Sequence, residues 1–506
     1  MELFQKYRVR NHVILWVATV LILAWRIPNC WRDSIFIAED AWVFFADAYN
    51  KPWTVSLLTP YAGYFHLLPR ILAEVFSILP IVLQPYVYGM VSLAIDAFLI
   101  TVFYFPHFET LIRSNRVRAG VIVLMALAGN AENLGMLDGI NWYVSFAMAM
   151  MLVMNPPEGR VGRIAMYALA FLTIWSTPAV IVLFPFFIFR CKYGSTPFIR
   201  RWSLFACINQ IPVVFFVVWM RIGSTGGTEK ILLSELPVAL ERLVLRGWFG
   251  CGLLGEWLTI KIIHFQPVFL DIWSTFWLLF IVWIVLRFRH NTSVRRIAVL
   301  LLISLLMIFL SLTRSEYISE LGKTILSRHP RYLTVPTLLT IIGLWGIAYN
   351  LWGNSRPRLL CLFGLIQLLF LLVGAPNSWH PSRPDFPKAS GVFKLKDYVA
   401  AIRSFEDEYR ETGEPATLYV PMDVIFWGPV LKKGGGYEYL APLPLADGLG
   451  CKPDEEGNCD SWLGKFRQIP DSQMIEHERL GLLEFLGIWD GRVWFRDAQD
   501  RTVMTS

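Results

Sequence analysis

Glu39 and Asp40 stand side by side in FIAEDAWVFFADAYNKPWTVSLLTPYAGYFHLLPR (residues 36–70), directly after the first long apolar segment of the chain. An ionised carboxylate at the edge of hydrocarbon is costly unless it is solvated, paired or used in chemistry. One interpretation is a solvated helix start, where acids favour the helix dipole. The other is a general base that removes the proton of an incoming hydroxyl group.

A second polar stretch, GNAENLGMLDGINW (residues 129–142), separates two short apolar segments. Sugar hydroxyls need both hydrogen-bond donors and acceptors, and an aromatic face suits a pyranose ring. We therefore expect Glu132, Asn133, Asp138 and Trp142 to line a sugar or acceptor site. The alternative is a capped, solvated turn.

His66 and Arg70 lie one helical turn apart and would share a face. Arg70 is a candidate ligand of a phosphate group, and the alternative partner is a lipid headgroup. His66 is grouped with the acceptor-binding residues, although a lone histidine is more often hydrogen-bonded than catalytic.

Cations near the same side form the third candidate group. They are Arg221, Lys323, Arg328 and Arg331, the last followed by Tyr332. Basic residues are uncommon outside the cytoplasmic loops of membrane proteins, and guanidinium groups bind phosphate oxygens bidentately. Arg331 with Tyr332 is the leading candidate for binding a donor phosphate.

The elements that must position these residues are membrane helices. Of the 506 residues, 55% are hydrophobic and 17% are charged, and the mean hydropathy is +0.48. Long apolar blocks of this kind are typical of a polytopic membrane protein. We expect eleven crossings, at Val13–Ile27, Tyr86–Phe105, Ala119–Leu134, Trp142–Met154, Ile164–Trp175, Pro178–Phe189, Ser203–Trp219, Ile272–Leu286, Ile297–Leu312, Leu333–Tyr349 and Leu359–Val373.

The basic loops predict the orientation. If residues 66–79 form a helix lying in the membrane interface, every strongly basic loop falls on one side. These loops are residues 6–10, 113–118, 160–163, 190–201, 287–296 and 356–358. The positive-inside rule then places the N-terminus in the cytoplasm and the candidate residues outside. The net charge of +7 thus reflects topology, and no nucleic-acid partner is expected.

Residues 375–506 differ in composition, with 21 acids against 15 bases and no further apolar segment. The division predicted is a membrane domain, residues 1–374 with the outer loop 28–83, and an external mixed α/β domain, residues 375–506. Cys451 and Cys459 flank a polar loop there, and an oxidising compartment would favour a bridge between them. Residues 229–259 read as amphipathic helices on the outer leaflet, either a gate or a cap.

The segments Ala38-Glu39-Asp40, residues 56–64, Leu68-Pro69-Arg70 and Arg328-His329-Pro330-Arg331-Tyr332 together resemble the GT-C superfamily of membrane glycosyltransferases. The likeness extends to the whole architecture: acids after the first crossing, juxtamembrane helices in the first outer loop, and an external C-terminal domain. It is closest to the bacterial branch that modifies O-antigen and other envelope glycans. By this resemblance Asp40 is the base, and Glu39 orients the acceptor or tunes its neighbour.

The resemblance implies an inverting transferase in the bacterial inner membrane, with its C-terminal domain in the periplasm. Its donor would be a sugar on undecaprenyl phosphate, and its acceptor an envelope glycan such as the O-antigen of lipopolysaccharide. No organic cofactor is expected, and a divalent ion is a weaker expectation. Alternatives are a transferase acting on protein or lipid A, and a flippase or transporter for a lipid-linked sugar. A receptor or scaffold is the third class.

Overall fold

The computed structural model describes residues 2–27, 40–61, 63–79, 83–129, 133–223, 248, 250–255, 258–259, 261–262, 267–312, 330–353 and 355–375, with five strands between residues 417 and 505. Several predicted features lie outside these residues. They are Glu39, Glu132, Lys323, Arg328, the cysteines 451 and 459, and most of the stretch 229–259. The backbones of Arg221 and Arg331 are described, and their side chains are not.

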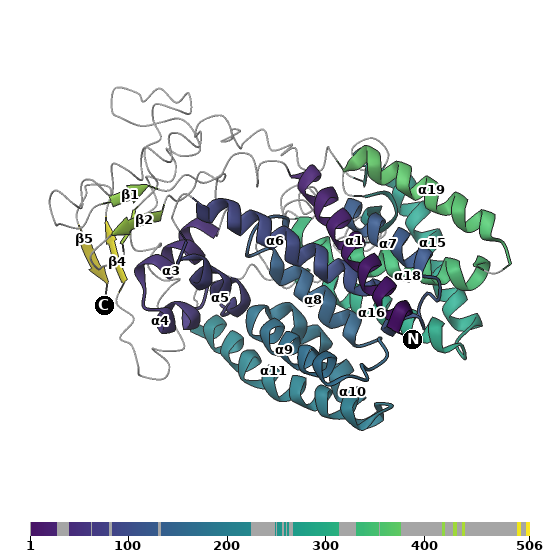
Figure 1. Ribbon diagram of the computed structural model, residues 1–506, viewed down its shortest axis with the longest axis horizontal. Coiled ribbons are helices and arrows are strands. Elements are labelled where there is room, and N and C mark those ends of the chain that lie inside the picture. The colour runs from purple at the N-terminus through teal and green to yellow at the C-terminus, as the bar shows by residue number, and fades with distance from the viewer. Residues whose placement is uncertain are drawn as a thin grey trace.

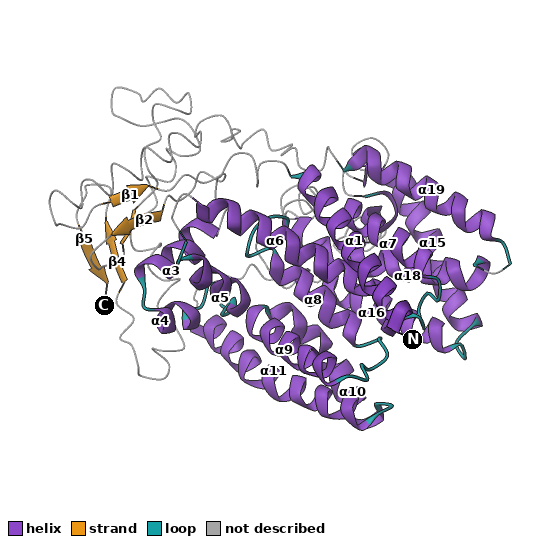
Figure 2. Ribbon diagram, viewed as in Figure 1, coloured by secondary structure: helices purple, strands orange, loops and turns teal. Residues whose placement is uncertain are grey.

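Helices make up the described part of the chain as far as residue 375 (Figures 1 and 2). The longer ones are α1 (Glu2–Arg26), α6 (Gln84–Thr101), α7 (Asn115–Ala128), α8 (Ile140–Met151), α9 (Arg160–Ser176), α10 (Phe184–Tyr193), α11 (Pro197–Gly223), α15 (Pro267–Arg287), α16 (Thr292–Leu312), α18 (Thr334–Trp352) and α19 (Pro357–Gly374). Each of the eleven predicted apolar segments overlaps one of these helices, as expected of a helical membrane protein. The segments 119–134, 142–154 and 178–189 also include residues outside α7, α8 and α10.

Helix length gives a lower number of membrane crossings than the sequence predicted. Within the described residues, six helices are long and apolar enough to cross a membrane, and a seventh crossing results if one bent pair counts as a span. That pair is α9 with the segment 178–193, between which the chain turns by 118°. At 14 and 12 residues, α7 and α8 are shorter than the roughly 20 residues of a perpendicular crossing. The lengths thus support fewer crossings than the eleven predicted.

Helix α18 is the core of the bundle. Every residue from Thr334 to Ala348 is buried, and the helix contacts α7, α8, α16 and α19. Two glycines allow α16 to approach closely: a Cβ atom on Gly343 would lie 2.5 Å from Leu301 Cδ2, and one on Gly346 would lie 2.6 Å from Ile297 Cδ1. Small residues at such contacts are how membrane helices pack without a hydrophobic driving force.

The helices at the periphery of the bundle present apolar side chains outward. On α15 the exposed residues include Phe276, Leu279 and Leu286, and on α19 they include Leu362 and Leu369. An apolar surface of this extent is the surface expected to face lipid.

Arginines from two of the predicted basic loops bond to the same stretch of chain at one end of the bundle. The Arg296 guanidinium, at the start of α16, donates hydrogen bonds to Val153 O and Asn155 Oδ1, both beyond the end of α8. Arg190, near the end of α10, donates to the carbonyl of Leu152. Segments far apart in sequence are therefore tied together there through arginine.

The opposite end carries the segment after α1. It consists of a π-helical turn (η1, Asp40–Phe45) followed by α3 (Ala46–Asn50), α4 (Trp53–Leu58) and α5 (Leu67–Phe76). Ten residues at about 1.5 Å each make α5 roughly 15 Å long, too short to cross a bilayer. Its buried face, which includes Pro69, Arg70 and Ala73, packs against the bundle, and this is compatible with the predicted interfacial helix.

Five short strands are described in the C-terminal region: β1 (Thr417–Tyr419), β2 (Pro429–Lys432), β3 (Glu438–Leu440), β4 (Val493–Arg496) and β5 (Thr502–Thr505). They form one sheet in chain order, antiparallel except for the parallel pair of β3 and β4. β2 lies beside α3, near the end of the bundle that carries the candidate residues (Figure 1). The boundary predicted at residue 375 stays a prediction.

The contact between α16 and α18 yields a test of this packing. Gly343→Ala is expected to lower the melting temperature of the protein in detergent, because the added methyl group displaces Leu301 at a cost of about 1–3 kcal/mol. Gly120→Ala in α7 is the matched control, since no atom lies within 4 Å of its new Cβ. Equal melting temperatures for the two variants would contradict the close approach of α16 and α18.

Candidate functional site

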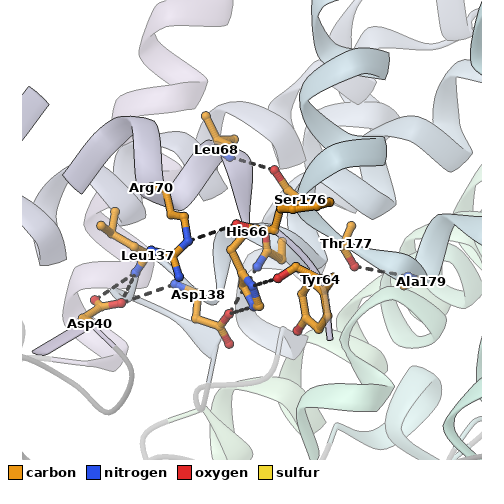
Figure 3. Close-up of polar contacts among 12 residues, drawn as sticks. Asp40, Tyr64, His66, Leu68, Arg70, Leu137, Asp138, Ser176, Thr177 and Ala179 are labelled. Atoms are coloured by element: carbon orange, nitrogen blue, oxygen red, sulfur yellow. Dashed lines mark hydrogen bonds and ion pairs between the residues drawn. The ribbon is translucent and has the colours of Figure 1, made fainter. Parts of the chain in front are cut away.

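Asp40 anchors the second polar stretch to the first. Its carboxylate is buried at 1% exposure and accepts hydrogen bonds from the backbone N–H of Leu137, 2.9 Å from each oxygen, and from that of Asp138 at 3.3 Å. Two regions about 97 residues apart in sequence thus meet through one side chain (Figure 3). Backbone donors of this kind stabilise the charged form of a buried carboxylate.

Asp138 is the more accessible of the two acids. Its side chain retains 13% of its exposure, and its Oδ1 atom lies 3.1 Å from His66 Nε2 and 3.2 Å from Asn141 Nδ2. His66 is fully buried, so only Asp138 of this pair is partly exposed. Figure 3 shows the two side chains facing each other. The arrangement is a buried imidazole behind a partly exposed carboxylate.

The backbone that presents His66 is unusual. His66 has φ +51°, in the left-handed region that non-glycine residues seldom adopt, and it immediately precedes α5. A tight turn comes before it: Tyr61 and Tyr64 exchange backbone hydrogen bonds across Gly63, whose φ is +85°. From the other side, the Ser176 hydroxyl at the end of α9 accepts the N–H of Leu68. Strained backbone held by surrounding contacts is common at functional sites.

The His66 ring faces two acceptors at once. Nδ1 lies 3.2 Å from the Tyr64 carbonyl oxygen, and Nε2 faces Asp138. A neutral imidazole can donate to only one of them, whereas an imidazolium can donate to both. Burial lowers the pKa of His66, and this outweighs the opposing effect of the Asp138 carboxylate. His66 is therefore neutral at pH 7 and donates to only one of the two oxygens. A second proton on the ring would let it donate to the other oxygen as well.

Arg70 is engaged in an ion pair that the sequence did not predict. Its Nη1 lies 2.6 Å from Asp47 Oδ2, and its Nε donates to the carbonyl of Phe65. Lys51 approaches the other oxygen of Asp47 at 2.9 Å. Because Arg70 is buried at 1% exposure, this geometry favours a structural role over the predicted contact with a donor phosphate. The sequence feature that could have predicted this ion pair is Asp47, an acid 23 positions before the buried Arg70.

The second polar stretch is also tied to the start of α18. Asn133 Nδ2 donates to Thr334 Oγ1 at 2.7 Å, inside the protein. The ring of Trp142 meets that of Tyr332 edge to face, with centroids 5.3 Å apart. Tyr332 belongs to a 3-10 turn (η9, Pro330–Leu333) that leads into α18. These contacts bring the Arg-Tyr element to the same loop that Asp40 holds.

Seven of the predicted site residues are described with their side chains, and six of them join this arrangement directly. Asp40, His66, Asn133, Asp138, Trp142 and Tyr332 are linked through the loop 133–142, while Arg70 lies beside it in its own ion pair. Residues that sequence reasoning did not single out include Asp47, Asn141, Tyr64 and Thr334.

A metal site is not evident in the part of the chain that the structure describes, where no three His, Cys, Asp or Glu side chains cluster suitably for an ion. The expectation of a divalent ion stays a prediction, since Glu39 and Glu132 lie outside the described residues. Comparison with known proteins adds no relative: no protein-family model matches the sequence, and no curated protein is significantly similar to it.

The Asp47 ion pairs predict an unequal response to two substitutions. Asp47→Asn leaves the buried Arg70 without its counter-ion and is expected to lower the free energy of unfolding by about 3–5 kcal/mol. Lys51→Gln keeps the Asp47–Arg70 pair and should cost about 1 kcal/mol or less. Chemical denaturation of both variants in the same detergent measures the difference. A loss as large for Lys51→Gln as for Asp47→Asn would contradict the importance of the buried pair.

Proposed function

We propose that this chain is an inverting glycosyltransferase of the GT-C type, which moves one sugar from a polyprenyl phosphate carrier to a hydroxyl group of an envelope glycan. One observation carries the proposal. Residues chosen for separate roles, from segments near positions 40, 66, 133–142 and 332, converge on a single loop at one end of an apolar helical bundle.

The chemistry requires a base for the acceptor and positive charge for the departing phosphate. The acceptor oxygen forms a bond to the anomeric carbon, and the bond from that carbon to the phosphate oxygen breaks. The electron pair leaves with the lipid phosphate, and the hydroxyl proton goes to a carboxylate. A single displacement of this kind inverts the anomeric centre.

The base is best assigned to Asp138, although the sequence favoured Asp40. Both oxygens of Asp40 face backbone N–H groups and are buried, which suits a carboxylate that positions the loop. Asp138 is partly exposed, and a proton arriving on it can be shared with His66 Nε2 at 3.1 Å. The roles of Asp40 and Glu39 in proton transfer stay predictions of the sequence.

Arg331 remains the proposed ligand of the donor phosphate. Its backbone lies in η9, next to Tyr332, whose ring contacts Trp142 of the loop. A guanidinium group there would stabilise the negative charge that develops on the leaving phosphate. Arg328 and Arg221 are proposed as further cations around the lipid phosphate.

The two ends of the bundle support a proposal for the compartment. The arginine-rich end is assigned to the cytoplasm and the Asp138 end to the periplasm of a bacterial inner membrane, by the positive-inside rule. The donor would be undecaprenyl-phosphate-linked sugar and the acceptor O-antigen. The C-terminal region, with β2 beside α3, would lie on the acceptor side.

A flippase for a lipid-linked sugar is the second candidate, and Asp96 is the observation that favours it. This acid is fully buried in α6, and ionisable residues inside membrane helices often mark transport paths. Transfer to protein or to lipid A is the remaining alternative within the enzyme class.

An assay with purified protein in lipid vesicles separates these candidates. The vesicles are given a panel of synthetic polyprenyl-phosphate hexoses and pentoses on the side of the Asp138 end, with O-antigen, lipid A or peptide as acceptor. Formation of a glycosylated product supports the transferase and identifies its acceptor. Movement of intact donor across the bilayer without product supports the flippase and contradicts the proposal.

Substitutions then test the assignment of the base. Asp138→Asn is expected to lower kcat by about 10²–10⁴-fold with little change in the donor KM, because only proton transfer is lost. His66→Asn tolerates the left-handed backbone but takes up no proton, so a smaller loss of kcat is expected. Glu109→Gln, at the arginine-rich end, is the control and should leave kcat unchanged. Full activity of Asp138→Asn would refute the assignment.

A further inference from the structure

Helix α6 carries a polar stripe on its buried face. Gln84, Tyr88, Ser92 and Asp96 recur every fourth residue, so they lie along one side of the helix over three turns. All four are buried at 1% exposure or less. The stripe begins at the end of the bundle where the Asp138 site lies and runs about 18 Å inward to Asp96.

Several polar atoms of this stripe lack partners. Both carboxylate oxygens of Asp96, the Ser92 hydroxyl and Gln84 Oε1 form no hydrogen bond with any described residue. Helix α8 packs against α6 and contributes two more such atoms, the Tyr143 hydroxyl and Asn141 Oδ1. Buried polar groups in proteins are nearly always hydrogen-bonded, to protein or to ordered water. The number of such polar atoms along the contact between α6 and α8 indicates that water is enclosed there.

The surroundings of Tyr143 show how the contact between α6 and α8 continues toward α1. A Cβ atom on Gly129 would lie 3.2 Å from the Tyr143 hydroxyl and 3.7 Å from Arg26 Nη1, so these two groups border the same point. Asp96 and Arg26 both act electrostatically on Tyr143. Arg26 itself donates to the carbonyl of Ala126.

Asp96 has no cationic partner among the described residues. It is in none of the ion pairs formed among the described residues. An uncompensated carboxylate inside a membrane bundle is strongly unfavourable, so a proton or a cation must accompany it. Ser92, one turn earlier on α6, and Tyr143, on the neighbouring α8, carry hydroxyl groups, which both donate and accept hydrogen bonds as water does. No cluster of acids suited to a metal ion occurs among the described residues.

We propose that Asp96 is a proton-binding site inside the membrane bundle, connected by water along Ser92, Tyr88 and Gln84 to the end of the bundle that carries Asp138. Its carboxyl group holds the proton at neutral pH and donates a hydrogen bond to enclosed water. The site is independent of sugar transfer and holds for a transferase or a flippase alike.

Infrared spectroscopy of the full chain in lipid vesicles tests the proposal. The difference between wild type and Asp96→Asn at pH 7 should contain the C=O band of a protonated carboxyl group, and this band should shift soon after transfer to D₂O. Ser92→Ala should keep the band and slow its exchange about tenfold, the equivalent of one lost hydrogen bond. If Asp96→Asn does not fold, Asp96→Glu keeps the acid and assigns the band by its changed frequency.

The control is Asp271→Asn in α15, which makes the same change on another apolar helix and should leave the band in place. Carboxylate bands in place of the C=O band would show that Asp96 is ionised and overturn the proposal. A C=O band that does not exchange in D₂O would also overturn it, since it would mean a dry interior.

Discussion

The hydrogen bonds from the loop 137–138 to the Asp40 carboxylate are the contacts on which the candidate site depends. They join the segment after α1 to the connection between α7 and α8, which carries Asp138 and leads into the first turn of α8, where Trp142 lies. Because each backbone N–H group points in a fixed direction, the position of the Asp40 carboxylate determines the position of the loop. A carboxylate accepts several of them at once, which a neutral amide or hydroxyl does less strongly.

Of four acids in the bundle, three are stabilised by different partners, and the fourth has none among the described residues. Asp40 is met by backbone amides, Asp47 by two cationic side chains, and Asp138 by His66 and an amide side chain. Asp96 has no such partner among the described residues. The difference tracks depth: the first three lie where loops and the interfacial helix supply donors, and the last lies within a helix whose own backbone groups are already paired.

Apolar composition and loop charge predicted the helices well, because both are set by the solvent that each residue faces. The eleven apolar segments each overlap a helix, and arginines from two of the predicted basic loops bond to the same stretch after α8. What composition cannot give is direction, so the pairing of Arg70 with Asp47 was not anticipated. Residue type suggested Asp40 as a base. Only the structure shows that its carboxylate already accepts hydrogen bonds from the N–H groups of Leu137 and Asp138.

The burial of α18 on all sides bears on how the chain is assembled during translation. The ribosome releases α7, α8 and α16 before α18, yet these helices surround it in the finished protein. The contacts of α18 with these helices can therefore form only once the chain has been made as far as α18.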